Sequence, residues 1–257
     1  MARLSFMLPI AGFVLAGGKS SRMGEDKASL RLEGHSLLDI ACRKLLAITS
    51  EVFIVGSRKQ FGAEAIEDIF ADRGPLGGIH AALALSHAEL NLVMAVDLPF
   101  VENKFLGYLA REAKASDAVV TLPRTADGWQ PLCGVYGQSF LLPAEKALRA
   151  GHNKIDHLFK EISLRIIDEV ELRGAGFNPE MFDNLNTPGD ATRARQRLQK
   201  GVLSSSQPWP TLAPLKSSMT TAHLRRRKGS FALTALSPTS NSAMYLRRLA
   251  RMWCWMM

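Results

Sequence analysis

Cysteine is scarce in this sequence and shows no pairing pattern. The 257 residues include three cysteines, Cys42, Cys133 and Cys254, an odd number without C-x-x-C spacing. Secreted disulfide scaffolds need cysteine pairs and zinc sites need closely spaced cysteines, so the sequence argues against both. We expect buried, reduced thiols instead.

Long apolar runs are also missing. No uninterrupted apolar stretch approaches the ~20 residues that span a bilayer. The short apolar segment 4–10 runs directly into the glycine-rich motif described below, and cleavage of a signal peptide would remove the strand that leads into that motif. We therefore predict a cytoplasmic protein that does not bind membranes.

Acidic residues are absent from residues 191–257, which carry twelve of the 32 Lys and Arg residues. The remaining residues hold 20 basic and 24 acidic side chains, so the net charge of +8 comes from residues 191–257.

Composition also divides the chain. Stretches 204–210 and 235–241 are rich in Pro, Ser and Thr, a composition typical of disorder. We predict a folded domain over residues 1–200 and a basic, Ser/Pro-rich, disordered tail over 201–257. The tail could bind nucleic acid or anionic lipid, but a solvated extension without a partner is the simpler interpretation.

Two widespread phosphate-binding motifs are absent from the glycine-rich segment near the N-terminus. A Walker loop requires G-x-x-x-x-G-K-[ST], but the position five residues after Gly18 is Met23. The dinucleotide fingerprint G-x-G-x-x-G also fails, because Gly17 and Gly18 are adjacent and the next glycine is Gly24.

An apolar run at residues 13–16 nevertheless enters a loop that combines glycines with positive charge. Glycines let backbone N–H groups approach phosphate oxygens, while arginine grips two oxygens and lysine supplies a mobile charge. The loop residues of these types are Gly17, Gly18, Gly24, Lys19, Arg22 and Lys27. Their combination predicts a cradle for a polyphosphate.

The segment from Leu15 to Lys27 matches the pattern L-A-G-G-x-S-x-R-M-G-x-D-K throughout. In this motif the sequence resembles the molybdenum cofactor guanylyltransferases, nucleotidyltransferases that attach GMP to molybdopterin. The resemblance extends over about residues 10–199. It implies GTP and molybdopterin as substrates, with molybdenum-insertion proteins and apo-molybdoenzymes as further partners. It also implies nucleotide-binding roles for Leu15, Ala16, Gly17, Lys27, Asp68 and Asp97, and catalytic roles for Arg22, Lys27 and Asp97.

A second chemical element follows an apolar strand predicted at residues 90–96. Asp97 ends this strand and Pro99 follows, which puts a carboxylate at the carboxyl end of the sheet beside the phosphate loop. Mg²⁺ prefers one or two protein carboxylates, completed by phosphate oxygens and water. Capping of a helix that begins near Glu102 is the structural alternative. The matching aspartate of the family's D-x-P segment coordinates Mg²⁺, so the resemblance implies Mg²⁺ as cofactor and Asp97 as its ligand.

Two further segments agree with the resemblance. Segment 66–78 resembles the family's E-D…G-P-L-x-G segment, in which the aspartate that matches Asp68 belongs to the nucleotide site. Segment 129–136 resembles a strand on the side where the pterin docks. Trp129 and Tyr136 could stack on a ring there, although aromatic side chains of strands are more often core residues.

The closing segment 182–190 resembles N-x-N-T-P-x-[DE]. In related nucleotidyltransferases, an asparagine in the position of Asn186 assists the aspartate that binds the metal. Thr187 and Pro188 alone would predict only the start of a helix.

Strand-like and helix-like segments alternate along the first domain. Apolar spacing predicts a helix over 36–46, a loop that leads into a helix within 74–85, and strands at 52–55, at Ile66 and at 90–96. This alternation, together with the resemblance, indicates an α/β fold: a mainly parallel, Rossmann-like nucleotidyltransferase sheet with helices on both faces. Such sheets bind ligands at their carboxyl edge.

The implied reaction is attack of the terminal phosphate of molybdopterin on the α-phosphorus of GTP, with release of pyrophosphate. A phosphate nucleophile is already anionic at neutral pH, since its second pKa is about 6, and needs no general base. Alignment and charge neutralisation remain as the tasks of Arg22, Lys27 and a metal on Asp97. Relatives that use CTP resemble L-A-A-G and D-Q-P at the two motifs, so the L-A-G-G and D-L-P of this chain favour GTP. A cytidylyltransferase, a sugar-phosphate nucleotidyltransferase and a non-catalytic carrier of the cofactor are the alternatives.

Overall fold

The structure is a computed structural model that describes residues 8–17, 27–32, 34–185 and 190. Its strands are β1 (Leu8–Leu15), β2 (Arg31–Leu32), β3 (His35–Ser36), β4 (Thr49–Val55), β5 (Leu90–Ala95), β6 (Val120–Thr125), β7 (Gly128–Trp129), β8 (Cys133–Gly137) and β9 (Leu164–Asp168). Its helices are α1 (Leu37–Leu46), α2 (Arg58–Phe61), α3 (Gly74–Leu85), α4 (Asn103–Lys114), α5 (Leu141–Arg149), α6 (Ile155–Leu158) and α7 (Glu169–Gly174), with 3₁₀ turns η1 (Lys27–Ser29), η2 (Gln138–Phe140) and η3 (Pro179–Phe182). The tail predicted over 201–257 lies outside the described residues.

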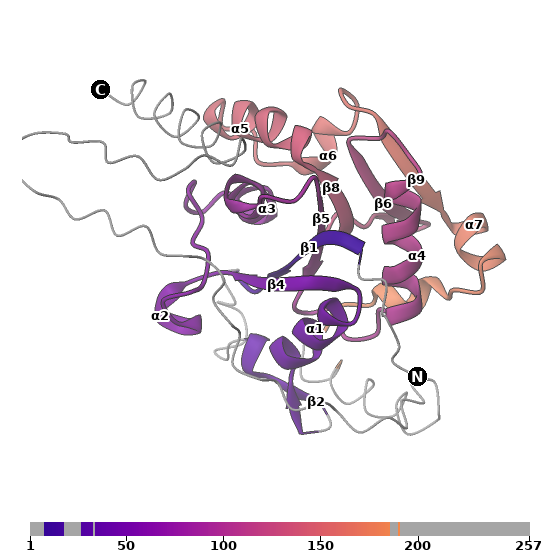
Figure 1. Cartoon of the computed structure of the whole chain (residues 1–257), viewed down its shortest axis with the longest axis horizontal. Coiled ribbons are helices and arrows are strands. Elements are labelled where there is room, and N and C mark those ends of the chain that lie inside the picture. Colours follow the sequence, from indigo (N-terminus) through magenta and orange to yellow (C-terminus); the bar gives the residue numbers. More distant parts are fainter. Residues whose placement is uncertain (1–7, 18–26, 33, 186–189, 191–257) are drawn as a thin grey trace, which may run out of the picture. The chain divides into compact units, whose positions relative to one another are not determined.

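Seven of the described strands form one mixed sheet in the order β4-β1-β5-β8-β6-β7, with β9 paired to β6 (Figure 1). β1 is parallel to both β4 and β5, and β9 is parallel to β6. β8 is antiparallel to β5 and β6, and β7 is antiparallel to β6. Five strands therefore run in one direction, and the predicted mainly parallel, Rossmann-like fold is confirmed.

Several predicted elements are confirmed and two predicted strands are not. The segment 74–85, predicted as a loop that leads into a helix, is helical throughout as α3. α1 begins one residue later than predicted because Ser36 caps it, its Oγ accepting from the Asp39 N–H at 3.1 Å. The strand predicted at Ile66 is wrong: this residue forms only an isolated bridge to Val55, since exposed acidic residues follow it directly. The strand expected over 129–136 is interrupted at 130–132, where Pro131 has no N–H for a strand ladder.

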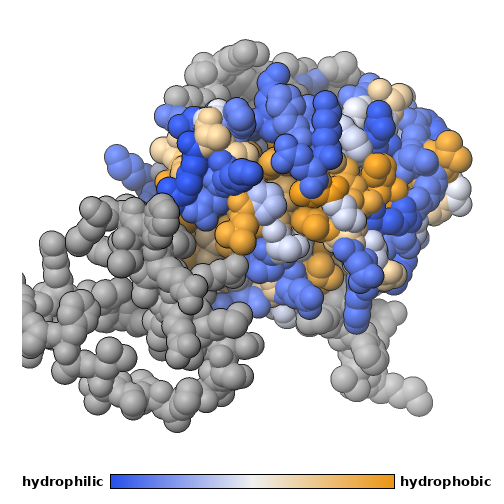
Figure 2. All heavy atoms as spheres, turned by 90° about the horizontal axis from the view of Figure 1, so that it is seen from above, coloured by the Kyte–Doolittle hydropathy of each residue, from blue (hydrophilic) through white to orange (hydrophobic). Residues whose placement is uncertain are grey.

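One face of the sheet is covered by α3 and α5. Ala11, Phe13 and Leu15 of β1 face this side and join one buried cluster with Leu76 and Ile79 of α3. In Figure 1 these helices lie above β1 and β4. Figure 2 views the molecule from above and shows apolar residues gathered in a band among hydrophilic ones.

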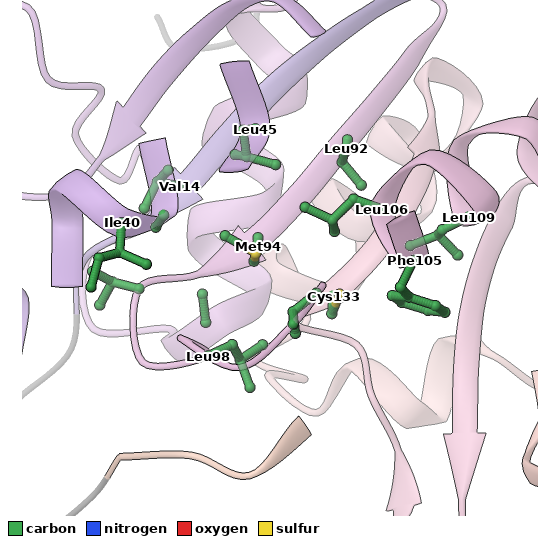
Figure 3. Packing of buried hydrophobic residues seen from close by; sticks show 14 of the residues in the cluster. Val14, Ile40, Leu45, Leu92, Met94, Leu98, Phe105, Leu106, Leu109 and Cys133 are labelled. Carbon is green, nitrogen blue, oxygen red and sulfur yellow. The ribbon is translucent and has the colours of Figure 1, made fainter. Parts of the chain in front are cut away.

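The opposite face is covered by α1 and α4. Val14 of β1 and Met94 of β5 meet Leu45 of α1 and Phe105 of α4, and all four side chains are completely buried (Figure 3). Burying each such side chain stabilises the fold by about 1.5–3 kcal/mol. Because helices cover both faces, the central strands are apolar on both sides, as parallel sheets require.

Two of the three cysteines lie in this core. Cys42 and Cys133 are buried and free, and burial raises the pKa of each thiol to about 12. The prediction of buried, reduced thiols is confirmed for these two, whereas Cys254 lies outside the described residues. Among the described helices, none is long and apolar enough to cross a membrane.

Candidate active site

The chain reverses its winding direction between β1 and β5. It passes from β1 through α1 to β4 on one side of β1, and then through α3 to β5 on the other side. In open α/β sheets, ligands bind outside the carboxyl ends of the strands at such a switch point. The residues that end β1 and the residue Asp97, beyond the end of β5, flank this point. The topology thus brings together two motifs that are 80 residues apart.

The end of β1 is fixed by both neighbouring strands. The Ala16 N–H donates to the Val55 carbonyl at 2.9 Å, and the Leu15 carbonyl accepts from the Val96 N–H at 3.1 Å. Leu15 and Ala16 are buried, whereas Gly17 is exposed. The described start of the phosphate motif is therefore a rigid strand end that presents Gly17 at the edge of the sheet.

Gly17 lies against a second glycine that the sequence analysis missed. A Cβ on Gly56, which follows β4 directly, would lie 3.3 Å from the Gly17 nitrogen and 2.8 Å from Phe61 Cε2. Only a residue without a side chain fits between these atoms. The sequence signal was present, because a glycine immediately follows the apolar strand 52–55.

Most of the predicted phosphate loop lies outside the described residues. Arg22 lies outside the described residues, as do Gly18, Lys19 and Gly24 of the loop. The backbone of Lys27 begins η1. Their predicted roles stay predictions.

Asp68 lies two residues beyond the bridge that joins Ile66 to β4. Its carboxyl group faces the first turn of α3, since a Cβ on Gly77 would lie 3.6 Å from Oδ2 and one on Gly78 would lie 3.7 Å from Oδ1. Burial of this carboxyl, and then the charge of Asp72, raise the pKa of Asp68, although the residue as a whole is exposed. The glycines of the G-P-L-G-G segment therefore make room for Asp68 beside the end of β4.

Asp97 is half-buried and its backbone is tied to the closing segment. The Leu185 N–H donates to the Asp97 carbonyl at 3.0 Å, which brings the residues around Leu185 alongside the end of β5. The exposed Asn184 precedes this contact, whereas Asn186 lies outside the described residues. The capping alternative for Asp97 is wrong, because the N-cap residue of α4 is Glu102.

Asp97 offers hard oxygen donors at the edge where a triphosphate would lie. Mg²⁺ accepts a single protein carboxylate when phosphate oxygens and water complete its coordination. The donor chemistry of Asp97 and its position beside the phosphate motif therefore fit such an ion.

The aromatic residues of segment 129–136 pack within the protein. Tyr136 is completely buried, and its hydroxyl donates to the Pro131 carbonyl at 2.6 Å, so it is a core residue and cannot stack on a ligand. Trp129 is half-buried, with its ring edge-on to Phe159 at a centroid distance of 5.3 Å. The guanidinium of Arg124 lies 4.8 Å from the centroid of the Trp129 ring.

Comparison with known proteins identifies the family. The model of the MobA-like NTP transferase domain matches residues 12–166. The chain belongs to this family. Membership confirms the resemblance inferred from the phosphate motif and makes the protein a nucleotidyltransferase, as its fold indicates.

Individual relatives of this MobA-like transferase match along nearly their whole length. A probable molybdenum cofactor guanylyltransferase of Opitutus terrae is 34% identical over 203 residues, which cover 73% of this chain and 96% of the relative. One of Pelotomaculum thermopropionicum is 33% identical over 193 residues, covering 74% and 93%. The crystal structure of molybdopterin-guanine dinucleotide biosynthesis protein A from Archaeoglobus fulgidus superposes with a TM-score of 0.65 at 29% identity, covering 74% of this chain and 100% of that one.

Proposed function

We propose that the protein transfers GMP from GTP to the terminal phosphate of molybdopterin, releases pyrophosphate, and so acts in molybdenum cofactor biosynthesis. The observation that supports the proposal is that the end of β1, where the phosphate motif begins, and Asp97, beyond the end of β5, flank the same switch point. The names of the relatives support guanylyl transfer as the reaction of this site.

The chain's own groups have binding and charge-neutralising tasks in this reaction. Backbone N–H groups that begin at Gly17 would hold the triphosphate, and Arg22 and Lys27 would balance its negative charge. Asp97 would hold Mg²⁺, which when bound neutralises charge on phosphate oxygens. An oxygen of the acceptor phosphate forms a bond to the α-phosphorus while the bond from that phosphorus to the bridging oxygen breaks. Pyrophosphate carries away the electron pair, and the anionic acceptor has no proton to lose.

Guanine is the proposed base for two reasons in the sequence. The motif reads L-A-G-G at Leu15 and D-L-P at Asp97, whereas the CTP-using relatives resemble L-A-A-G and D-Q-P. Asp68, beside the first turn of α3, adds a carboxylate that can accept hydrogen bonds from guanine or from cytosine, so it supports a nucleobase site and does not select the base.

The test is pyrophosphate release by the full chain with molybdopterin and Mg²⁺, in parallel reactions with GTP and with CTP. A reaction with GTP and no acceptor measures simple hydrolysis, and mass spectrometry identifies the dinucleotide product. We expect release with GTP that depends on the acceptor, and its loss in Lys27→Ala and Asp97→Ala. Release with CTP alone would refute the guanine assignment, and no release with either nucleotide would refute the reaction.

A further inference from the structure

Lys44 of α1 reaches across to the segment that follows Asp97. Its Nζ donates to the carbonyl oxygen of Val101 at 2.5 Å, a contact between residues 57 positions apart. Val101 is completely buried, and its carbonyl precedes the first carbonyl used inside α4, that of Glu102, which accepts from the Leu106 N–H at 3.1 Å. A buried carbonyl outside a helix requires a hydrogen-bond donor. Lys44 supplies that donor.

A lysine at this position has a cost in desolvation free energy. Burial lowers the pKa of Lys44 to about 8, and the nearby Glu102 carboxylate opposes this shift. A buried ammonium group loses its hydration, and an apolar side chain of similar length would fill the same space without that penalty. What the lysine adds is its hydrogen bond to Val101.

The turn of residues 97–101 is held at both of its ends. At the start, Val96 donates to the Leu15 carbonyl at 3.1 Å and Leu185 donates to the Asp97 carbonyl at 3.0 Å. At the end, Lys44 holds the Val101 carbonyl. The intervening Leu98 and Phe100 are buried in the core cluster between the sheet and α1 and α4. Loss of the Lys44 contact would therefore free one end of the turn that carries Asp97.

We propose that Lys44 is a positioning residue that fixes the turn of residues 97–101 and thereby holds the Asp97 carboxylate at the nucleotide site. The inference rests on the proposed function, in which Asp97 acts on the triphosphate. Lys44 itself touches no substrate and acts through the backbone of the turn.

The experiment compares Lys44→Met, Lys44→Arg and Lys104→Met in the full chain. Lys44→Met keeps the length of the side chain and removes its donor, and Lys44→Arg keeps a donor. Lys104→Met makes the same change of charge at an exposed lysine on α4, three residues after Val101, and serves as the matched control. Each variant is measured for kcat, KM for GTP, the Mg²⁺ concentration at half-maximal rate, and hydrogen exchange of peptides that cover residues 97–103.

In Lys44→Met we expect kcat to fall on the order of 10-fold and the half-maximal Mg²⁺ concentration to rise several-fold, because small displacements of a reacting geometry have large effects. KM for GTP should stay within about twofold, since the phosphate motif is untouched, and exchange over residues 97–103 should accelerate. Lys44→Arg should recover part of kcat, and Lys104→Met should behave as wild type.

Two results would overturn the role of Lys44. One is a Lys44→Met enzyme whose kcat and Mg²⁺ dependence stay within about twofold of wild type; the other is a loss of thermal stability without change in those two parameters. A wild-type protein that releases no pyrophosphate would instead refute the proposed function. Hydrogen exchange then decides the tether alone: equal rates in Lys44→Met and Lys104→Met overturn it, and faster exchange in Lys44→Met supports it.

Discussion

Replacement of Gly17 by alanine should separate nucleotide binding from folding. The added Cβ would lie 3.6 Å from Gly56 Cα and 4.0 Å from the Val55 carbonyl oxygen, which are ordinary contact distances. The φ angle of Gly17 lies outside the left-handed region, so alanine can adopt this backbone without strain. Folding should therefore be unchanged, or favoured by about 0.4–1 kcal/mol because the unfolded chain loses conformational freedom.

Binding of GTP should weaken in the same variant. A methyl group beside the backbone limits how closely a phosphate oxygen can approach. A hydrogen bond to a charged group contributes about 1.5–3 kcal/mol. Losing one such bond corresponds to a rise in KM for GTP of about 10- to 100-fold.

Gly107→Ala on α4 is the matched control. Its Cβ would lie 3.6 Å from Ile48 Cδ1 and 3.7 Å from an Arg111 guanidinium nitrogen, again ordinary contacts. Alanine inside a helix should stabilise the protein by about 0.5–1 kcal/mol and leave KM unchanged. Urea unfolding and GTP titration of both variants measure the two effects. A Gly17→Ala enzyme with the wild-type KM would refute the assignment of this strand end to the phosphates, and strong destabilisation would refute the steric argument.

Three further variants test other parts of the site and core. Asp97→Asn should lower kcat about 100-fold and keep the hydrogen bond from Leu185, which goes to the backbone carbonyl of residue 97; pyrophosphate release measures kcat, and thermal melts monitor folding. Gly56→Ala should lower the free energy of unfolding by about 1–3 kcal/mol, since its Cβ would come within 2.8 Å of Phe61 Cε2, as urea unfolding would show. His80 is 2% exposed and burial lowers its pKa, so its contribution to stability is full above its ordinary pKa of 6.5 and is lost as pH falls below that value. The free energy of unfolding, measured between pH 5 and 7, should therefore change less with pH in His80→Leu than in wild type.

The parts of the fold and site that could be predicted are those encoded by neighbouring residues. Hydrophobic spacing predicted α1 to within one residue, because a helical stripe is a local pattern. The helix within 74–85 was predicted as well, but not its start at Gly74. The position of Asp97 followed from an apolar run that ends in a carboxylate, which puts the carboxylate at the carboxyl edge of any parallel sheet.

The features that escaped prediction depend on contacts between distant segments. Nothing near Lys44 in the sequence indicates that its ammonium meets Val101. The resemblance alone links the closing segment to Asp97, and the spacing of residues does not indicate the backbone bond from Leu185. The burial of Tyr136 agrees with the expectation that aromatic side chains of strands are core residues, but the place of β8 between β5 and β6 is not specified by its own residues. Each of these contacts depends on the order and direction of the strands in the sheet.

The reversed direction of β8 also determines what lies beside Asp97 on the side away from β1. Because β8 is antiparallel to β5, its amino end and the preceding loop 130–132 meet the carboxyl end of β5. The Ala95 N–H donates to the Leu132 carbonyl at 2.8 Å and joins the two. Asp97 therefore has the phosphate motif on one side and a short loop, not a crossover helix, on the other. In-line displacement needs the nucleophile opposite the leaving pyrophosphate. Under the proposed function, we therefore expect the acceptor phosphate to approach from the side of loop 130–132.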